Sequence, residues 1–164
     1  MKYFVIVSTV ILSGLFGRST NPDTDWFYDQ STFQAFYMLE NVTIDGNTAE
    51  GDGSGAPPND AACYTSGACD VVGAFVDRAG VEVCVGWVYA EENSPNVTTV
   101  PLMGSDGSDA TSGYLASGES AYLKIYDSSN GFTLDVTPGE ALPGWSNNGI
   151  FVISGTSSAN NALG

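Results

Sequence analysis

The sequence contains no histidine and only four lysine and arginine residues, against 19 aspartate and glutamate residues, so the 164-residue chain carries a formal net charge of −15 at pH 7. Nucleic acids and anionic membrane surfaces are bound through many lysine and arginine side chains, and the charge therefore excludes both as partners. Without histidine, neither a Ser-His-Asp nor a Cys-His catalytic arrangement can form. The chain also lacks a G-x-S-x-G turn, a phosphate-binding loop and a dinucleotide fingerprint, which removes the common hydrolases and kinases.

Carboxylates are the remaining catalytic candidates, because paired carboxylates hydrolyse glycosides. Glu91, Glu92, Glu119 and Glu140 are available. A solvated acidic surface explains these residues without any chemistry, and a chain of this size does not easily form a deep cleft. We therefore predict that the protein is not an enzyme. The minor alternative, a small glycosidase, needs two carboxylates that face each other across a groove.

The sequence also lacks helical periodicity and any apolar run of the roughly 20 residues that a membrane-spanning helix needs, so we expect no integral membrane association. Instead, 20 glycines and many Ser, Thr, Asn and Asp residues separate short runs of Val, Ile, Phe and Tyr, which is typical of an all-β protein. With 43% hydrophobic residues, the chain can form one core. The predicted fold is a single immunoglobulin-like or jelly-roll-like β-sandwich over residues 25–164, preceded by an extended N-terminal arm and polar connector over residues 1–24.

Seven or so short strands are expected in the sandwich. The first is centred on residues 35–42 and ends at Asp45-Gly46, before an exposed loop over residues 47–60. A hairpin follows over residues 71–89. Further strands are expected at residues 98–103, 120–126, 132–136 and 149–154.

The hairpin has the clearest pattern, because two runs with alternating side chains flank Arg78-Ala79-Gly80. A three-residue loop that ends in glycine fits a turn closed by a bulge, and it pairs Asp77 with Val81. In that register, one face of the hairpin is strongly apolar and is expected to face the core. This face carries Val71, Gly73, Phe75, Val83, Val85 and Trp87.

The longest apolar run, YFVIVSTVIL at residues 3–12, is rich in β-branched side chains. A run of this length behind Lys2 and before small residues is typical of a secretory signal peptide. Apolar side chains on both faces are also typical of a strand that is buried on both sides. One face carries Tyr3, Val5, Val7 and Ile11. The other face carries Phe4, Ile6, Val10 and Leu12.

Three cysteines leave one unpaired if the bridges are intramolecular. The expected hairpin register places Cys84 opposite Ala74 and Cys69 opposite Tyr89, so these two cysteines are badly placed for a bridge. Cys63 and Cys69 are separated by a five-residue loop that closes easily. We predict a Cys63–Cys69 disulfide, which fits an exported protein, and a buried thiol at Cys84. No C-x-x-C pair or histidine favours a metal site at these residues.

The loop GSDGSD at residues 104–109 concentrates carboxylate, hydroxyl and carbonyl oxygens, which are the ligands that calcium prefers. Asp106 and Asp109 are the candidate ligands, with Asp127 as a remote third. The loop does not match an EF-hand, and the same residues also form a good turn. No cofactor is required by the functions considered, and calcium is the one candidate.

Two further kinds of surface site are suggested by short patterns. The Asn-x-Thr sequons at Asn41 and Asn96 are candidate N-glycosylation sites, although such triplets also arise by chance. In the loop at residues 144–149, Trp145 is a candidate to stack on a sugar whose hydroxyls hydrogen-bond to Asn147 and Asn148. A tryptophan in a β-loop more often plugs the end of the core.

A series of short segments runs in order through most of the chain: FQAFYML at 33–39, IDG at 44–46, DVVGAFVD at 70–77, VCVG at 83–86, PLMGSDGSD at 101–109, TSGY at 111–114, KIYD at 124–127 and WSNNG at 145–149. Over roughly residues 25–154, the chain resembles β-sandwich modules repeated in large secreted or surface proteins of environmental bacteria. The resemblance implies a β-sandwich and no enzymatic role. Two departures from that pattern, a single module and an apolar arm of its own, favour self-assembly.

These observations predict a structural subunit of an extracellular or cell-surface filament. Residues 3–12 of one copy, which reach roughly 30 Å when extended, would add a strand to the next copy or fill its groove, and repetition would give a head-to-tail homopolymer. The alternative is a secreted monomeric module that binds glycans or cell surfaces. It would begin near Ser19 after cleavage of a leader.

Overall fold

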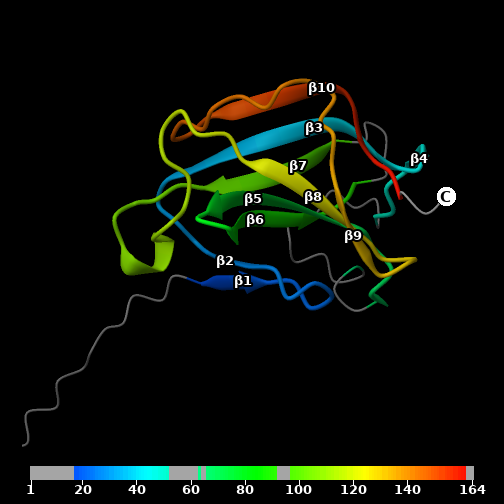
Figure 1. The fold of residues 1–164 in the computed structure, drawn as a ribbon, viewed down its shortest axis with the longest axis horizontal. Coiled ribbons are helices and arrows are strands. Elements are labelled where there is room, and N and C mark those ends of the chain that lie inside the picture. Colours follow the sequence, from blue (N-terminus) through cyan, green and yellow to red (C-terminus); the bar gives the residue numbers. More distant parts are fainter. Residues whose placement is uncertain (1–16, 52–62, 64–65, 92–96, 162–164) are drawn as a thin grey trace, which may run out of the picture.

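The computed structural model of the protein is an all-β sandwich (Figure 1). It describes residues 17–51, 63, 66–91 and 97–161. The predicted arm at residues 3–12 and the sequon at Asn96 lie outside the described residues. The elements are β1 Arg18–Thr20, β2 Phe27–Asp29, β3 Gln34–Ile44, β4 Asn47–Thr48, β5 Val71–Arg78, β6 Val81–Tyr89, β7 Thr98–Met103, the 3-10 helix η1 Asp109–Thr111, β8 Tyr122–Asp127, β9 Phe132–Asp135 and β10 Ile150–Ala159.

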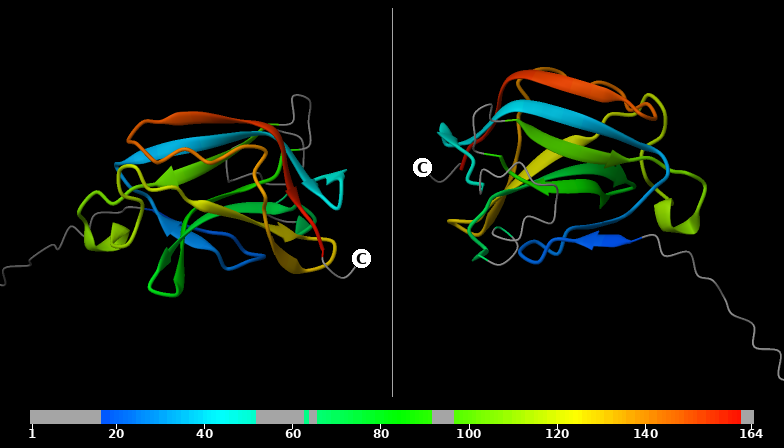
Figure 2. Two further views of the ribbon diagram at one scale, coloured as in Figure 1. Left: turned by 45° about the horizontal axis from the view of Figure 1, so that its top comes forward. Right: turned by 180° about the vertical axis from the view of Figure 1, so that it is seen from behind.

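Two four-stranded sheets form the sandwich, and a short ribbon of β1 and β2 lies below them (Figures 1 and 2). In the first sheet, β3 pairs in parallel with β10 and antiparallel with β7, while β4 pairs with the end of β3. The second sheet has the antiparallel order β6-β5-β8-β9. No helix within the described ranges is long and apolar enough to cross a membrane.

Strand β3 shows why the chain forms a sandwich, because its side chains alternate between the core and the outer face. Ala35, Tyr37 and Leu39 are fully buried, whereas their neighbours on the strand are partly or fully exposed. The strand ends at Ile44, and Asp45 and Gly46, with φ angles of 50° and 80°, form the turn predicted there. The strands expected at 35–42 and 98–103 are thus confirmed as β3 and β7. Strand β10 continues to Ala159, beyond the expected end.

The hairpin of β5 and β6 is confirmed, but the predicted turn is wrong. Arg78 pairs with Val81, so the loop has two residues, Ala79 and Gly80, with φ angles of 56° and 84°. Two consecutive positive φ angles are typical of a type I′ turn, which matches the twist of the strands. A register shift follows, because Phe75 pairs with Cys84 while Ala74 pairs with Gly86.

The predicted core face of the hairpin is buried, but β5 is buried on both of its faces. Val72 and Ala74 pair with Ile125 and Leu123, and these four side chains are buried at the interior of the sandwich. The opposite face packs against the N-terminal ribbon. There a Cβ atom on Gly73 would lie 2.8 Å from the ring of Trp26, so only glycine fits.

Residues 17–24, the described end of the predicted arm and connector, therefore form part of a third layer. Arg18, Ser19 and Thr20 pair with residues of β2, and the indole Nε1 of Trp87 donates to the carbonyl oxygen of Ser19 at 3.2 Å. The backbone N–H of Asp29 donates to the hydroxyl of Tyr114 at 2.6 Å. An apolar outer sheet face needs such a cover, since exposed aromatic side chains cost hydrophobic free energy.

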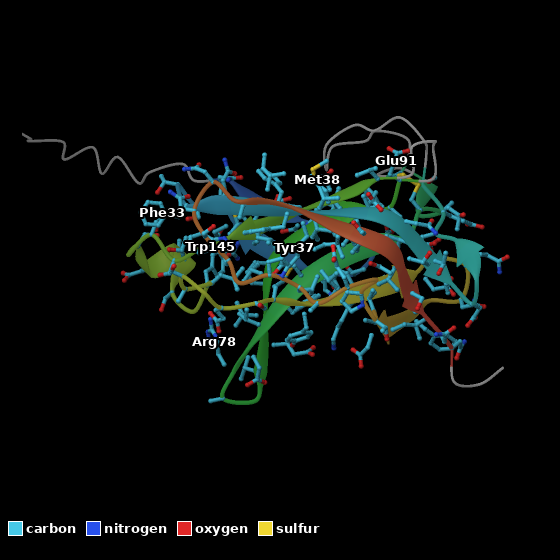
Figure 3. The ribbon with its side chains drawn as sticks, turned by 90° about the horizontal axis from the view of Figure 1, so that it is seen from above. Phe33, Tyr37, Met38, Arg78, Glu91 and Trp145 are labelled. Carbon is cyan, nitrogen blue, oxygen red and sulfur yellow. A yellow bond between two sulfur atoms is a disulfide. The ribbon has the colours of Figure 1, made fainter. Side chains whose placement is uncertain are left out.

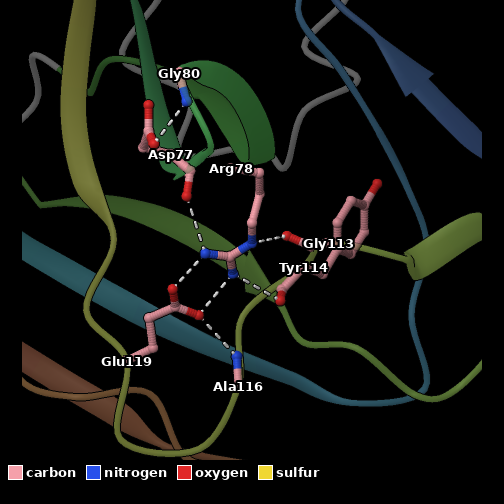
Figure 4. A network of polar contacts seen from close by, with 7 residues as sticks. All are labelled: Asp77, Arg78, Gly80, Gly113, Tyr114, Ala116 and Glu119. Carbon is pink, nitrogen blue, oxygen red and sulfur yellow. Dashed lines mark hydrogen bonds and ion pairs between the residues drawn. The ribbon is translucent and has the colours of Figure 1, made fainter.

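Arg78 fastens the hairpin to the segment before β8 (Figure 4). Its guanidinium makes two hydrogen bonds to the Glu119 carboxylate, at 2.5 and 2.7 Å, and it also donates to the carbonyl oxygens of Gly113 and Tyr114. Both partners of the ion pair are 32% exposed. Paired N–H groups of arginine match a carboxylate better than any other side chain does.

We expect Arg78→Ala to lower the free energy of unfolding by about 2 kcal/mol, because the carbonyl oxygens and Glu119 lose their donors together. Arg78→Lys should lose about half of that, since an ammonium group cannot bind the carboxylate through two parallel bonds. Denaturant unfolding measures both changes. Arg18→Ala, which removes an ion pair from a far more exposed arginine, is the control, and equal losses in all three variants would contradict the role of the network.

Candidate functional site

The first candidate surface is the open edge of β10. Among the described residues, β10 pairs with β3 on one side, and on the other side it makes one bridge, between Ser158 and Thr137. The N–H of Phe36 donates to the carbonyl oxygen of Gly149 at 2.9 Å, which sets the phase of the parallel ladder. In such a ladder alternate residues of β10 bond to β3, so the peptide groups of Ile150 and Val152 face away from it.

Apolar side chains accompany this open edge. Ile150 is 66% exposed and Val152 is 52% exposed. They pair with Phe36 and Met38 of β3, which are partly buried on the same outer face of the sheet. Figure 3 shows Met38 pointing away from the core and Tyr37 pointing into it. We call Phe36, Met38, Ile150 and Val152 the β10 patch.

Described residues protect the rest of β10, whereas none of them pairs with the outer edge of its first four residues. The N–H of Ser154 donates to Glu140 at 2.8 Å, and the N–H of Gly155 donates to Glu40 at 3.3 Å. Ile150–Ile153 carries no charge, proline or bulge, which are the features that natural edge strands use against pairing with other chains. This four-residue stretch is thus able to accept an added strand.

The second candidate surface is a cleft of about 580 Å³ between the N-terminal ribbon, the β5-β6 hairpin and the segment around η1. Four consecutive residues of β6, Val81–Cys84, line it. Since successive side chains of a strand point to opposite faces, the cleft runs along the edge of β6. Its apolar lining includes Trp26, Phe27, Phe75, Val81, Val83 and Tyr114.

The cleft is apolar inside and acidic at its rim. Arg18 stacks on Phe27, with 4.3 Å between the guanidinium carbon and the ring centroid, and it is paired with Asp29 at 2.9 Å. The hydrogen bond from Arg18 to Asp29 raises the pKa of Arg18. Asp25 and Asp109 also line the cleft, and neither is paired with a lysine or arginine that the structure describes.

Glu82 lies at the same rim and is held by two donors. Lys124 is paired with it at 2.5 Å, and the Tyr122 hydroxyl donates to it at 3.0 Å. The hydrogen bond from Lys124 lowers the pKa of Glu82. Burial, followed by the bond to Glu82, raises the pKa of Tyr122 to about 12.

The disulfide between Cys63 and Cys69 is confirmed. Cys84 is free, as predicted, but it is partly exposed in the wall of the cleft and not fully buried. Burial raises the pKa of its thiol to about 12, so the thiolate that would react or bind a metal is scarce at neutral pH.

Asp106, the first candidate calcium ligand, is an anchor for its own loop. One carboxylate oxygen accepts from the Thr111 hydroxyl at 2.7 Å and from the N–H of Ser108 at 3.1 Å, and the other accepts from the N–H and hydroxyl of Thr32. These hydrogen bonds, of which the one from Thr111 has the largest effect, hold the pKa of Asp106 well below its usual range. Asp109 is exposed at the start of η1.

Asp127, the third candidate ligand, caps the turn between β8 and β9. Its carboxylate accepts from the backbone and side chains of Ser129 and Asn130. Within the described part of the chain, no three acidic, cysteine or histidine side chains are grouped to hold a metal. Calcium binding stays a prediction, and the donor set on Asp106 and Asp127 explains both residues without it.

The loop of Trp145, Asn147 and Asn148 fastens the first sheet together. Trp145 is only 5% exposed, its Nε1 donates to the carbonyl oxygen of Leu102 at 3.1 Å, and Gly104 leaves room for its ring. The Asn147 side chain accepts from the N–H of Gln34, and the Asn148 N–H donates to the carbonyl oxygen of Gln34. Trp145 thus fills the core and offers no exposed ring on which a sugar could stack.

Asn41 is the sequon asparagine that lies among the described residues. It is partly buried on β3, and its Nδ2 donates to the Thr156 hydroxyl at 3.1 Å. Glycosylation at Asn41 stays a prediction. The chain matches no known protein-family model, no curated protein and no solved structure.

Neither surface can be predicted from the sequence, for different reasons. The apolar run at the start of β10 predicts a strand, but nothing in it shows which strand lies beside it or that one side stays open. The cleft gathers three segments that lie far apart in the chain, and none of them carries a motif.

The acid-base behaviour of Asp106 gives a test of the loop anchor. Its folded-state pKa lies below the unfolded value of about 3.9, so it adds stability above that pH, and the contribution is lost as the pH falls through the folded pKa. We expect Asp106→Asn to lower the thermal unfolding midpoint at pH 7. The difference from the wild type should shrink when both are measured below about pH 4. Asp109→Asn, at an exposed position of the same loop, is the control. If the difference in unfolding midpoint between Asp106→Asn and the wild type did not shrink in acid, the role of Asp106 as an anchor would be contradicted.

Proposed function

We propose that the protein is the structural subunit of an extracellular filament, in which residues 3–12 of one copy add a strand to the β10 edge of the next. The observation that carries the proposal is the open, uncharged stretch Ile150–Ile153 with its exposed apolar side chains. A strand added to an edge gains main-chain hydrogen bonds, and its side chains find neighbours on both faces of the sheet.

The chemistry of the two partners matches on both faces. On the outer face, an added strand lies beside Ile150 and Val152. On the inner face it lies beside Phe151, which is only partly buried and packs against the core. The run at residues 3–12 has apolar side chains on both of its faces, as such a position requires.

The geometry favours pairing between copies over pairing within one copy. The ribbon of β1 and β2 and the strand β10 lie at opposite ends of the sandwich (Figures 1 and 2). Only residues 13–17 join the apolar run to β1, and five residues span about 17 Å at most. When an arm and its acceptor edge lie at opposite ends of one subunit, repetition gives an open head-to-tail filament.

A test of the acceptor edge is the double variant Ile150→Lys/Val152→Lys, which places charge where the arm would dock. We expect folded monomers and no filaments by electron microscopy and sedimentation, because two ammonium groups beside an apolar strand lose their hydration. The matched control is Phe132→Lys/Thr133→Lys on β9, which adds the same charge to the edge of the other sheet. Filaments of normal length from the β10 variant would contradict the proposal.

The net charge predicts a dependence on salt. Copies that each carry a charge of −15 repel one another, and salt shortens the range of this repulsion from about 30 Å at 0.01 M to about 3 Å at 1 M. Light scattering should therefore show faster assembly at high ionic strength. Slower assembly in salt would show that attraction between charges, and not apolar contact, joins the copies.

A further inference from the structure

The cleft beside the N-terminal ribbon lies at the root of the arm. Arg18, the first residue of β1, lines the cleft, so the chain that leads to the arm leaves the sandwich at the rim. Phe27 and Val81 at this rim are 45% and 63% exposed. Large exposed apolar side chains around a concave surface are typical of a contact site for another protein.

The length of the connector determines what can reach this cleft. Once residues 3–12 are covered by a neighbouring copy, residues 13–17 connect them to β1, and five residues span about 17 Å at most. The body of that neighbour must then lie close to Arg18. We propose that the cleft of the arm-donating copy is the second contact of each filament junction and packs against the body of the copy that accepts its arm.

This inference rests on the proposed function, because it assumes that the arm docks on a neighbour. It also gives each junction a direction. The donor copy contributes its arm and its cleft, whereas the acceptor copy contributes its β10 edge. The acidic rim, with Asp25 and Asp109, faces an equally acidic neighbour, so apolar packing inside the cleft has to supply the attraction.

A single junction can be isolated from full-length and shortened chains. The donor is the full-length Ile150→Lys/Val152→Lys variant, which keeps its arm but lacks the acceptor edge. The acceptor comprises residues 17–164, which keep every described strand and the disulfide but have no arm. Mixing the two should give one-to-one complexes and nothing longer, with an affinity that sedimentation or calorimetry measures.

Two changes to the cleft test the inference through different physics. Val81→Glu adds charge at an exposed rim position, and Ala110→Trp fills the cleft from an exposed position of η1. Placed in the donor, each change should lower the affinity of the complex about tenfold or more, which is typical of a change at a buried contact. Placed in the acceptor, the same changes should leave the affinity unchanged. Phe132→Ser is the control in either partner, and thermal unfolding shows that each variant folds.

The outcomes separate the inference from the proposed function. Weakening by donor variants alone supports the second contact. If the variants change the affinity in neither partner, the second contact is overturned, whereas the proposed arm-mediated filament is not affected. Weakening by acceptor variants also overturns it, because the arm would then enter the cleft itself. If the unmodified donor and acceptor form no complex, the proposed function fails.

Discussion

The rest of the structure depends on the burial of strand β5 on both of its faces. Val72 and Ala74 face the interior of the sandwich, and Gly73 and Phe75 face outward, where water would otherwise meet them. A strand of this kind needs two covers. The ribbon of β1 and β2 covers the outer face of the second sheet. There Trp26 packs edge-on against Phe75, with 5.0 Å between the ring centroids. Because the ribbon is required there, the chain enters the sandwich at the end opposite β10.

This arrangement links the packing of the core to the proposed assembly. The ribbon fixes where the arm leaves, and the parallel pairing of β10 with β3 fixes where an edge stays open. The three described basic residues are all used in ion pairs, Arg18 with Asp29, Arg78 with Glu119 and Lys124 with Glu82. On a surface of this charge, the proposed contact between copies has to come from apolar packing and main-chain hydrogen bonds, and Ile150–Ile153 offers both in one place.

Local patterns predicted the parts of the fold that are themselves local. Short apolar and aromatic runs predicted the strands at residues 35–42 and 98–103, which are β3 and β7, and the short spacing of Cys63 and Cys69 predicted the disulfide. The turn at Ala79 could not be predicted, because alanine carries no preference for a positive φ angle. The ribbon was missed because only three residue pairs hold it, and its anchor, Trp87, lies 68 residues away from Ser19. The buried position of Trp145 likewise depends on a carbonyl oxygen 43 residues away.

Assembly by strand addition requires that the apolar run at residues 3–12 remains in the mature protein. N-terminal sequencing and intact mass of the secreted, assembled material test this directly. We predict chains that retain Met1 through Leu12 in the filaments. Chains that begin near Ser19 would contradict the account, because a sandwich that has lost the run has no arm to add to the next copy, and residues 3–12 would then be a leader for export.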